Sequence, residues 1–162
     1  AVPDDGDEEA IARVTEAAFR DAPHASHTEQ FIVQALRDAD QLAVSLVAVE
    51  NHAIVGHVTV SPVTIDGQRD WYGLGPISVL PSHHRKGVGT RLIEYALESL
   101  RRLGADGCVV LGDPVFYQRF GFEQYPSLVL PGVPQEYFQA LPFSCPVPTG
   151  VVGYHHAFEA TA

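Results

Sequence analysis

The sequence lacks methionine altogether and contains only two cysteines, one tryptophan and one lysine, Lys86. Two cysteines are too few for a disulfide framework, and Cys108 and Cys145 do not have the spacing of a metal-binding knuckle. We expect Cys108, inside the apolar run GCVVLG, to be a buried and reduced thiol. Because no initiator methionine is present, we expect the numbered chain to be processed or to omit the first residues of its protein.

Long apolar runs and positive charge are also scarce. No run approaches the roughly 18 residues that cross a bilayer, and no basic-then-apolar leader opens the chain. We therefore expect a soluble, cytoplasmic protein. Ten Lys and Arg residues stand against 20 Asp and Glu, so the formal net charge is −10. Such a surface repels nucleic acids and anionic membranes, which we exclude as partners, and it suits a cationic small substrate.

The length and composition predict one globular domain over residues 1–162, since 46% of the residues are hydrophobic and 19% are charged. Apolar residues at helical spacing predict helices, and β-branched runs between turn residues predict strands. Ser26 and Glu29 are placed as a capping box for the second helix. The expected helices cover 4–19, 26–40, 90–104 and 114–122, and the expected strands cover 42–50, 53–63, 65–80, 106–112, 136–143 and 150–158.

The order of these elements predicts an α+β fold with one mixed sheet. The first three strands form a meander, and the last two form a strand pair joined by a proline-rich loop. The helix over 90–104 has the clearest apolar stripe in the chain, and Gly104 is a ready cap for its C-terminus.

Residues 83–92, HHRKGVGTRL, place a glycine-rich loop between a strand and a helix. The first N–H groups of a helix have no intrahelical partner and carry partial positive charge, so such a loop is typical of phosphate binding. A solvated turn before an amphipathic helix is the alternative reading. The loop lacks the GxxxxGK[ST] and GxGxxG patterns, which excludes both common nucleotide-binding motifs. The groups that would meet a phosphate are those of Arg85, Lys86, Gly87, Gly89 and Thr90.

The stretch from about Gly75 to Phe122 resembles the core of the GNAT superfamily of acetyl-CoA-dependent N-acyltransferases. That family pattern is a strand ending V-x-P, then Q/R-x-x-G-x-G/A opening a long helix, a further strand, and a short helix ending FYxxxGF. In this chain the matching groups are Val79-Leu80-Pro81, Gly87-Val88-Gly89, and Phe116-Tyr117 to Gly121-Phe122. The variant GCVVLGDPVFYQRFGF looks most similar to a bacterial branch of uncharacterised, predicted acetyltransferases.

The resemblance implies a mostly antiparallel central sheet with helices on both faces, and acetyl-CoA as co-substrate without a metal. The coenzyme A diphosphate would lie on the N–H groups of residues 85–90, and the pantetheine arm along the strand ending at Val79. A bulge would turn an N–H of residues 77–79 toward the thioester carbonyl, because Pro76 has none. Tyr117 would be the catalytic acid toward the departing thiolate. The implied cofactor-binding residues are Ile77, Ser78, Val79, His84, Arg85, Lys86, Gly87, Val88, Gly89, Thr90, Asp113, Phe116 and Tyr117.

Two features depart from the family pattern. His84 stands at the Q/R position, where a neutral imidazole offers one N–H donor while glutamine offers two and arginine five. The first strand of the family is expected to be missing or short, because the first predicted helix begins close to Ala1.

The sequence leaves several candidates for the general base. The candidates are Glu50, His57, Ser61, Asp113 and His155, and Asp113 could instead cap the helix that starts at Pro114. Cys108 has no base beside it in sequence, so direct attack in a ternary complex is favoured over an acyl-cysteine route. The pairs His83-His84 and His155-His156 lack ligand spacing with a third partner, and we expect no metal site.

The leading hypothesis is an acyltransferase that moves an acetyl group from acetyl-CoA to the amine of a small molecule or peptide. A non-catalytic acyl-CoA-binding or sensing domain of the same fold is the alternative, and a phosphate-binding regulator unrelated to coenzyme A is a third reading. The choice of acceptor would rest with the two N-terminal helices, the loop around residues 22–27 and the segment 126–148. A homodimer through the C-terminal strands stays open.

Overall fold

The computed structural model describes residues 7–19, 29–39, 41–66, 68–83, 86–144, 146–154 and 158. The chain begins with the helices α1 (Glu8–Phe19) and α2 (Glu29–Asp38). A meander of strands follows: β1 (Val44–Glu50), β2 (Ala53–Ile65) and β3 (Gln68–Val79). The remaining elements are α3 (Val88–Leu103), β4 (Gly107–Leu111), α4 (Pro114–Tyr117), β5 (Leu128–Val129), β6 (Phe138–Pro142) and β7 (Gly150–Tyr154). Short 3-10 turns cover Pro81–His83, Gln118–Phe120 and Gln135–Tyr137.

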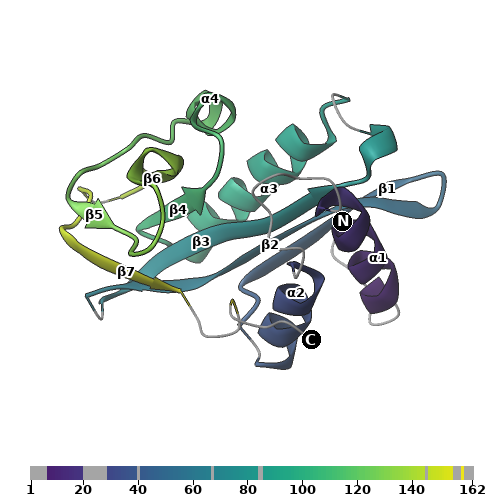
Figure 1. Ribbon diagram of the computed structural model, residues 1–162, viewed down its shortest axis with the longest axis horizontal. Coiled ribbons are helices and arrows are strands. Elements are labelled where there is room, and N and C mark those ends of the chain that lie inside the picture. Colours follow the sequence, from purple (N-terminus) through teal and green to yellow (C-terminus); the bar gives the residue numbers. More distant parts are fainter. Residues whose placement is uncertain are drawn as a thin grey trace.

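The strands form one mixed sheet in the order β5-β7-β2-β3-β4-β6, with β1 also paired to β2. β3 runs parallel to β4 and β5 runs parallel to β7, while the other four pairings are antiparallel. Helices α1 and α2 lie on one face of this sheet, and α3 lies on the other (Figure 1). The predicted α+β fold with a mostly antiparallel sheet and helices on both faces is confirmed.

The C-terminal strands differ from the prediction. We expected the last two strands to pair with each other, but β6 pairs with β4 and β7 pairs with β2 and β5. The strand β5 is only two residues long and was not predicted. No strand precedes α1 among the described residues, and the capping residue Ser26 lies outside them.

Helix α3 packs along the sheet through the apolar stripe that its sequence predicts. Leu92, Ile93, Ala96, Leu97 and Leu100 are buried, and they join the inward residues of β2, β3 and β4 in one cluster. Left-handed glycines bound the helix, with Gly87 at its N-cap and Gly104 at its C-cap. These contacts fix where α3 begins relative to the end of β3.

The opposite face of β2 carries a buried polar layer beneath α1. His57 lies opposite Ser78 of β3, and the Ser78 hydroxyl donates to Thr15 of α1 at 3.1 Å. The His57 Nε2 atom lies 2.9 Å from the Ser45 hydroxyl. The other ring nitrogen of His57 and the Ser61 hydroxyl have no hydrogen-bond partner in the structure as described. His57 is fully buried, so the layer is polar and closed to solvent.

Burial of His57 makes the stability of the fold depend on pH. Burial, with a smaller contribution from the Arg37 charge, lowers the pKa of His57 to about 4. Between this value and the ordinary pKa of about 6.5, the unfolded chain binds a proton that the folded chain does not. Stability is therefore lost as pH falls. We expect His57 to remove about 3 kcal/mol from the free energy of unfolding between pH 7 and pH 4.

Urea unfolding of the wild type and a His57→Gln variant at both pH values measures this contribution, because other titrating groups cancel in the comparison. His52→Gln is the matched control, since His52 lies exposed in the β1–β2 turn. The control should keep the wild-type pH dependence. An equal loss of stability in the wild type and in His57→Gln would contradict the assignment.

Candidate functional site

The adjacent parallel strands β3 and β4 separate at their C-terminal ends. Their pairing runs from Trp71 opposite Gly107 to Leu74 opposite Val110, and then stops. Beyond that point β3 stays with β2, because the Leu80 N–H donates to the Val55 carbonyl at 2.8 Å. The chain after β4 stays with its other neighbour, because the Gly112 N–H donates to the Tyr137 carbonyl at 2.9 Å. Each strand is thus held from its outer side, and β3 and β4 do not pair with each other beyond Leu74 and Val110; this divergence is what we call the cleft.

An irregularity in β3 lies where this separation begins. Val58 and Val60 of β2 are two residues apart, but their partners Ile77 and Leu74 are three apart, so β3 has one extra residue. The extra residue falls at Gly75-Pro76, which is joined by a cis peptide bond. Since the N–H of Leu80 faces β2, alternation along the strand turns the N–H of Ile77 away from β2, toward the cleft. The bulge expected near Pro76 is present.

The N-terminus of α3 lies directly after β3 in the chain. Gly87 adopts a left-handed conformation with φ of 81°, and its carbonyl accepts the first helical hydrogen bond from the Arg91 N–H at 3.1 Å. The N–H groups of residues 88–90 therefore precede the intrahelical ladder. Lys86 is exposed beside them. His84 and Arg85, which the sequence also assigns to this loop, lie outside the described residues.

The turn before this loop is tied to the tip of the β1–β2 hairpin. His83 Nε2 lies 3.2 Å from a Glu50 carboxylate oxygen, and His83 Nδ1 lies 2.8 Å from the Ser82 hydroxyl. Glu50 thus contacts this turn through its carboxylate.

Tyr117 ends α4, which follows β4 after a two-residue turn. Its side chain is 7% exposed and packs edge-to-face against Phe116 and Phe122, with ring centroids 5.1 and 5.9 Å away. Burial raises the pKa of Tyr117 to about 12, with smaller contributions from Cys108 and Asp113. The phenol is therefore protonated at neutral pH. One apolar cluster includes Tyr117, and Ile77, Val79, Val88 and Phe116 pack against it, so predicted site residues on β3, α3 and α4 border the same cluster.

Two predicted residues have clear local partners. Asp113 is the N-cap of α4, where its side chain accepts a hydrogen bond from the Val115 N–H at 2.9 Å. This is the capping arrangement that the sequence left as an alternative. Ser78 points away from the apolar cluster, since its hydroxyl bonds Thr15 beneath α1.

Cys108 is a buried free thiol, as the sequence predicts. Burial raises its pKa above the ordinary range, so the thiolate is disfavoured. This environment suits a packing residue and does not suit a nucleophile. Among the remaining base candidates, His57 and Ser61 lie in the closed polar layer, and His155 lies outside the described residues.

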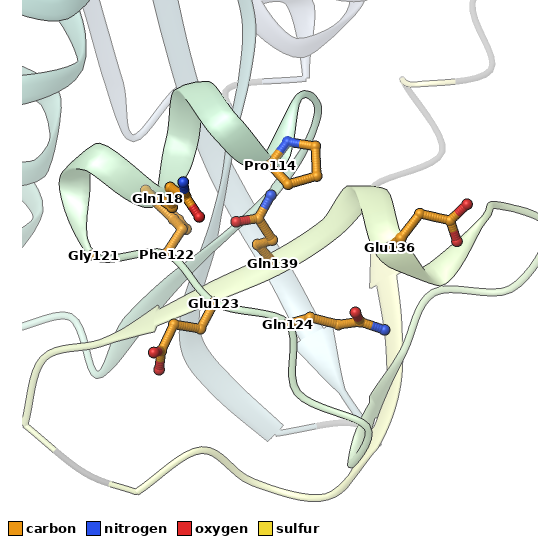
Figure 2. Close-up of a pocket in the computed structure, with 8 residues that line it drawn as sticks. All are labelled: Pro114, Gln118, Gly121, Phe122, Glu123, Gln124, Glu136 and Gln139. Atoms are coloured by element: carbon orange, nitrogen blue, oxygen red, sulfur yellow. The ribbon is translucent and has the colours of Figure 1, made fainter.

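A polar pocket on the side of α4 away from β3 escaped the sequence analysis. Its most buried polar group is Gln139, which lies between Phe138 and Ala140 in β6. A single glutamine among the apolar residues of a short strand gives no distinct sequence signal. Figure 2 shows this pocket with the residues that line it.

The part of the chain that the structure describes contains no group of three His, Cys, Asp or Glu residues placed to hold a metal ion. Nor does any described helix have the length and apolar character needed to cross a membrane. The cytoplasmic location and the homodimer stay predictions.

Known proteins are similar to this chain in sequence and in fold. The acetyltransferase (GNAT) domain family matches residues 41–124. The uncharacterized N-acetyltransferase YhbS of Escherichia coli K12 is 36% identical over 100 residues, which span 60% of this chain and 60% of that relative. YjhQ, a second uncharacterized N-acetyltransferase of the same strain, is 38% identical over 84 residues, which span 50% of this chain and 46% of the relative.

Two crystal structures match almost the whole chain. A GNAT family acetyltransferase from Brucella melitensis in complex with acetyl-CoA is 45% identical, with a TM-score of 0.88, covering 98% of this chain and 96% of that one. Escherichia coli YhbS in complex with CoA is 30% identical, with a TM-score of 0.89, covering 100% of this chain and 92% of that one. The family and the enzyme class expected from the sequence agree with these findings, and the chain belongs to the GNAT family of acetyltransferases.

Proposed function

We propose that this protein transfers the acetyl group of acetyl-CoA to an amine, which attacks the thioester directly in a ternary complex. The divergence of β3 and β4 carries the proposal, because β3 leads directly into the N-terminus of α3, and β4 leads into α4 with its buried Tyr117. The two similar crystal structures, bound to acetyl-CoA and to CoA, support this reading of the cleft.

The cofactor would be held mainly by main-chain groups. Its diphosphate would accept hydrogen bonds from the N–H groups of residues 88–90, aided by the helix dipole and by the Lys86 charge. The pantetheine arm would follow the open edge of β3 as an added strand. The N–H of Ile77 would then face the thioester carbonyl. His84, Arg85, Asp113 and Phe116 remain proposed cofactor contacts on the family pattern.

Acetyl transfer forms a bond from the amine nitrogen to the carbonyl carbon and then breaks the bond from carbon to sulfur. The carbonyl oxygen gains negative charge in between, and a donor such as the Ile77 N–H stabilises that charge. The sulfur leaves as a thiolate, and the proton that the attacking nitrogen loses passes to that thiolate or to solvent. Tyr117 is the group that would donate a hydrogen bond to it.

The pKa of Tyr117 refines this role. A phenol with a pKa of about 12 is a weaker acid than an ordinary thiol, whose pKa is about 8.5. Complete proton transfer from Tyr117 to the thiolate is therefore unfavourable. Hydrogen-bond donation by a neutral phenol stabilises the thiolate without that cost, and burial strengthens the bond.

The first prediction from the proposed function concerns the cofactor loop. Calorimetric titration should show that acetyl-CoA binds the wild type with micromolar affinity. Gly89→Glu should weaken binding by at least about 100-fold, because a carboxylate near the diphosphate costs about 3 kcal/mol. Gly89→Ala is the matched control. A Cβ at this position would lie 3.8 Å from Val79, an ordinary contact, so the fold and binding should persist.

Dephospho-coenzyme A tests whether the additional phosphate of coenzyme A adds to the affinity. A folded wild-type protein that does not bind acetyl-CoA at millimolar concentration would overturn the proposed function. Equal affinity of wild type and Gly89→Glu would place the diphosphate elsewhere.

The second prediction concerns Tyr117. With an acceptor found by an amine screen, Tyr117→Phe should lower kcat by about 100-fold, because one donor to the developing charge is lost. The affinity for acetyl-CoA should not change. Tyr125→Phe is the matched control, since it removes a hydroxyl that bonds Glu123 at the surface. Release of free thiol measures turnover.

The pH profile separates a phenol that donates a hydrogen bond from a phenol that gives up its proton. With a pKa of about 12, Tyr117 should add no basic limb to kcat below about pH 10. Turnover of Tyr117→Phe at the wild-type rate at every pH would show that the hydroxyl has no part in the reaction. Tight acetyl-CoA binding without turnover of any amine would instead support the acyl-CoA-sensing alternative.

A further inference from the structure

Gly112 directly follows β4, where the chain turns into α4 (Figure 1). Its φ angle lies outside the left-handed region, so backbone strain does not require a glycine at this position. The lack of a side chain here therefore has another cause, and that cause is the side chain that packs against it.

The ring of Tyr117 occupies the space that a side chain at Gly112 would fill. A Cβ atom at Gly112 would lie 2.5 Å from Cε2 of Tyr117, 3.2 Å from Cδ2 and 3.4 Å from Cζ. Carbon atoms in van der Waals contact are about 3.5–4.0 Å apart. One edge of the phenol ring thus lies directly against the main chain at the end of β4.

Both partners in this contact are held in place. The Gly112 N–H donates to the Tyr137 carbonyl at 2.9 Å, which ties the main chain to the segment before β6. The Tyr117 side chain is buried and packs edge-to-face against Phe116 and Phe122, with ring centroids 5.1 and 5.9 Å away. A methyl group added at Gly112 would therefore displace the phenol ring or distort the end of the strand.

The contact matters because α4 alone is a weak support for the phenol. The helix is four residues long, and a helix that short has little stability of its own. The end of β4 belongs to the central sheet, where it pairs with β6, and is a firmer support for a side chain. Through Gly112 the Tyr117 ring is fixed relative to that sheet, close to the point where β3 and β4 diverge.

We propose that Gly112 is a positioning residue for acetyl transfer, because its missing side chain lets the Tyr117 ring lie against the end of β4 and so places the hydroxyl at the departing sulfur. The role of the hydroxyl in this inference rests on the proposed function. The contact between Gly112 and Tyr117 does not, and it is measurable without any acceptor. A displacement of about 1 Å at a reacting group can lower a rate by about 100-fold.

Unfolding in urea tests the contact itself. Gly112→Ala should lower the midpoint urea concentration by about 1 M, because the added methyl group overpacks the ring. The same change in a Tyr117→Leu background should lower the midpoint by less than half as much, since leucine has no atoms at the positions of Cε2 and Cζ. If Gly112→Ala does not fold, recovery of folding by Tyr117→Leu establishes the same contact.

Nuclear magnetic resonance follows the position of the ring. With isotope-labelled tyrosine rings, the Tyr117 signal is identified among the six tyrosines by its loss in Tyr117→Phe. Coenzyme A should shift this signal in the wild type. Gly112→Ala should move the signal of the free protein and should reduce the shift caused by coenzyme A by at least half.

Turnover of an acceptor amine tests the consequence for the reaction. Gly112→Ala should lower kcat at least about tenfold, while KM for acetyl-CoA should stay within about twofold. In a Tyr117→Phe background the same change should alter kcat by less than about twofold, because the hydroxyl that Gly112 positions is already gone.

Gly107→Ala is the matched control. Gly107 is the first residue of β4, and its added Cβ would collide with the Trp71 ring, so this variant overpacks the same strand at its opposite end. It should lose stability but keep the Tyr117 signal, and it should keep kcat per folded molecule.

Several results would overturn the proposal. Equal loss of stability from Gly112→Ala in the wild-type and Tyr117→Leu backgrounds would show that the ring does not depend on Gly112. An unchanged kcat in Gly112→Ala, or an equal loss of kcat in Gly107→Ala, would show that Gly112 has no positioning role. Wild-type turnover by Tyr117→Phe would remove the proposed role of the hydroxyl, and the unfolding data would distinguish that failure from the absence of the contact.

Discussion

The candidate site depends on the point at which two neighbouring parallel strands stop pairing. Proline at position 76 has no N–H, so β3 cannot continue a regular ladder there, and the extra residue beside it shifts the register with β2. After the shift, Leu80 still bonds β2 while Gly112 bonds the segment before β6. The strands therefore diverge beyond Leu74 and Val110, because each is held on its outer side.

This separation also positions the two helices that flank the cleft. α3 starts nine residues after the last residue of β3, and α4 starts three residues after the last residue of β4. The α3 helix is anchored by five buried apolar residues, so its N-terminus is fixed relative to the open strand edge. The α4 helix is only four residues long and needs local support. That support comes from the Asp113 cap, Pro114 at the first turn and the aromatic contacts of Tyr117.

Local patterns in the sequence predicted most of these elements, since the information for them lies within a few residues. Examples are the apolar stripe of α3, the Gly104 cap at its C-terminus, and the start of α4 at Asp113-Pro114. The partners of the C-terminal strands were not predicted. Both β6 and β7 are short and apolar, and nothing local distinguishes pairing with each other from pairing with β4 and β2. Likewise, the closed polar layer around His57 and the buried, unpartnered amide nitrogen of Gln139 follow from long-range packing.

The positions of the candidate bases bear on how basic the acceptor amine can be. A histidine with a pKa of about 4 is too weak a base to take a proton from an ammonium ion, and His57 is also closed to solvent. Glu50 is paired with His83, and Asp113 is occupied as a cap. With these groups engaged, we expect the neutral fraction of the acceptor itself to limit the rate. At pH 7 that fraction is about 0.04% for an amine of pKa 10.4, but about 14% for one of pKa 7.8. On this reasoning we expect acceptors with weakly basic amines, such as α-amino groups, to react faster than alkylamines of the lysine type.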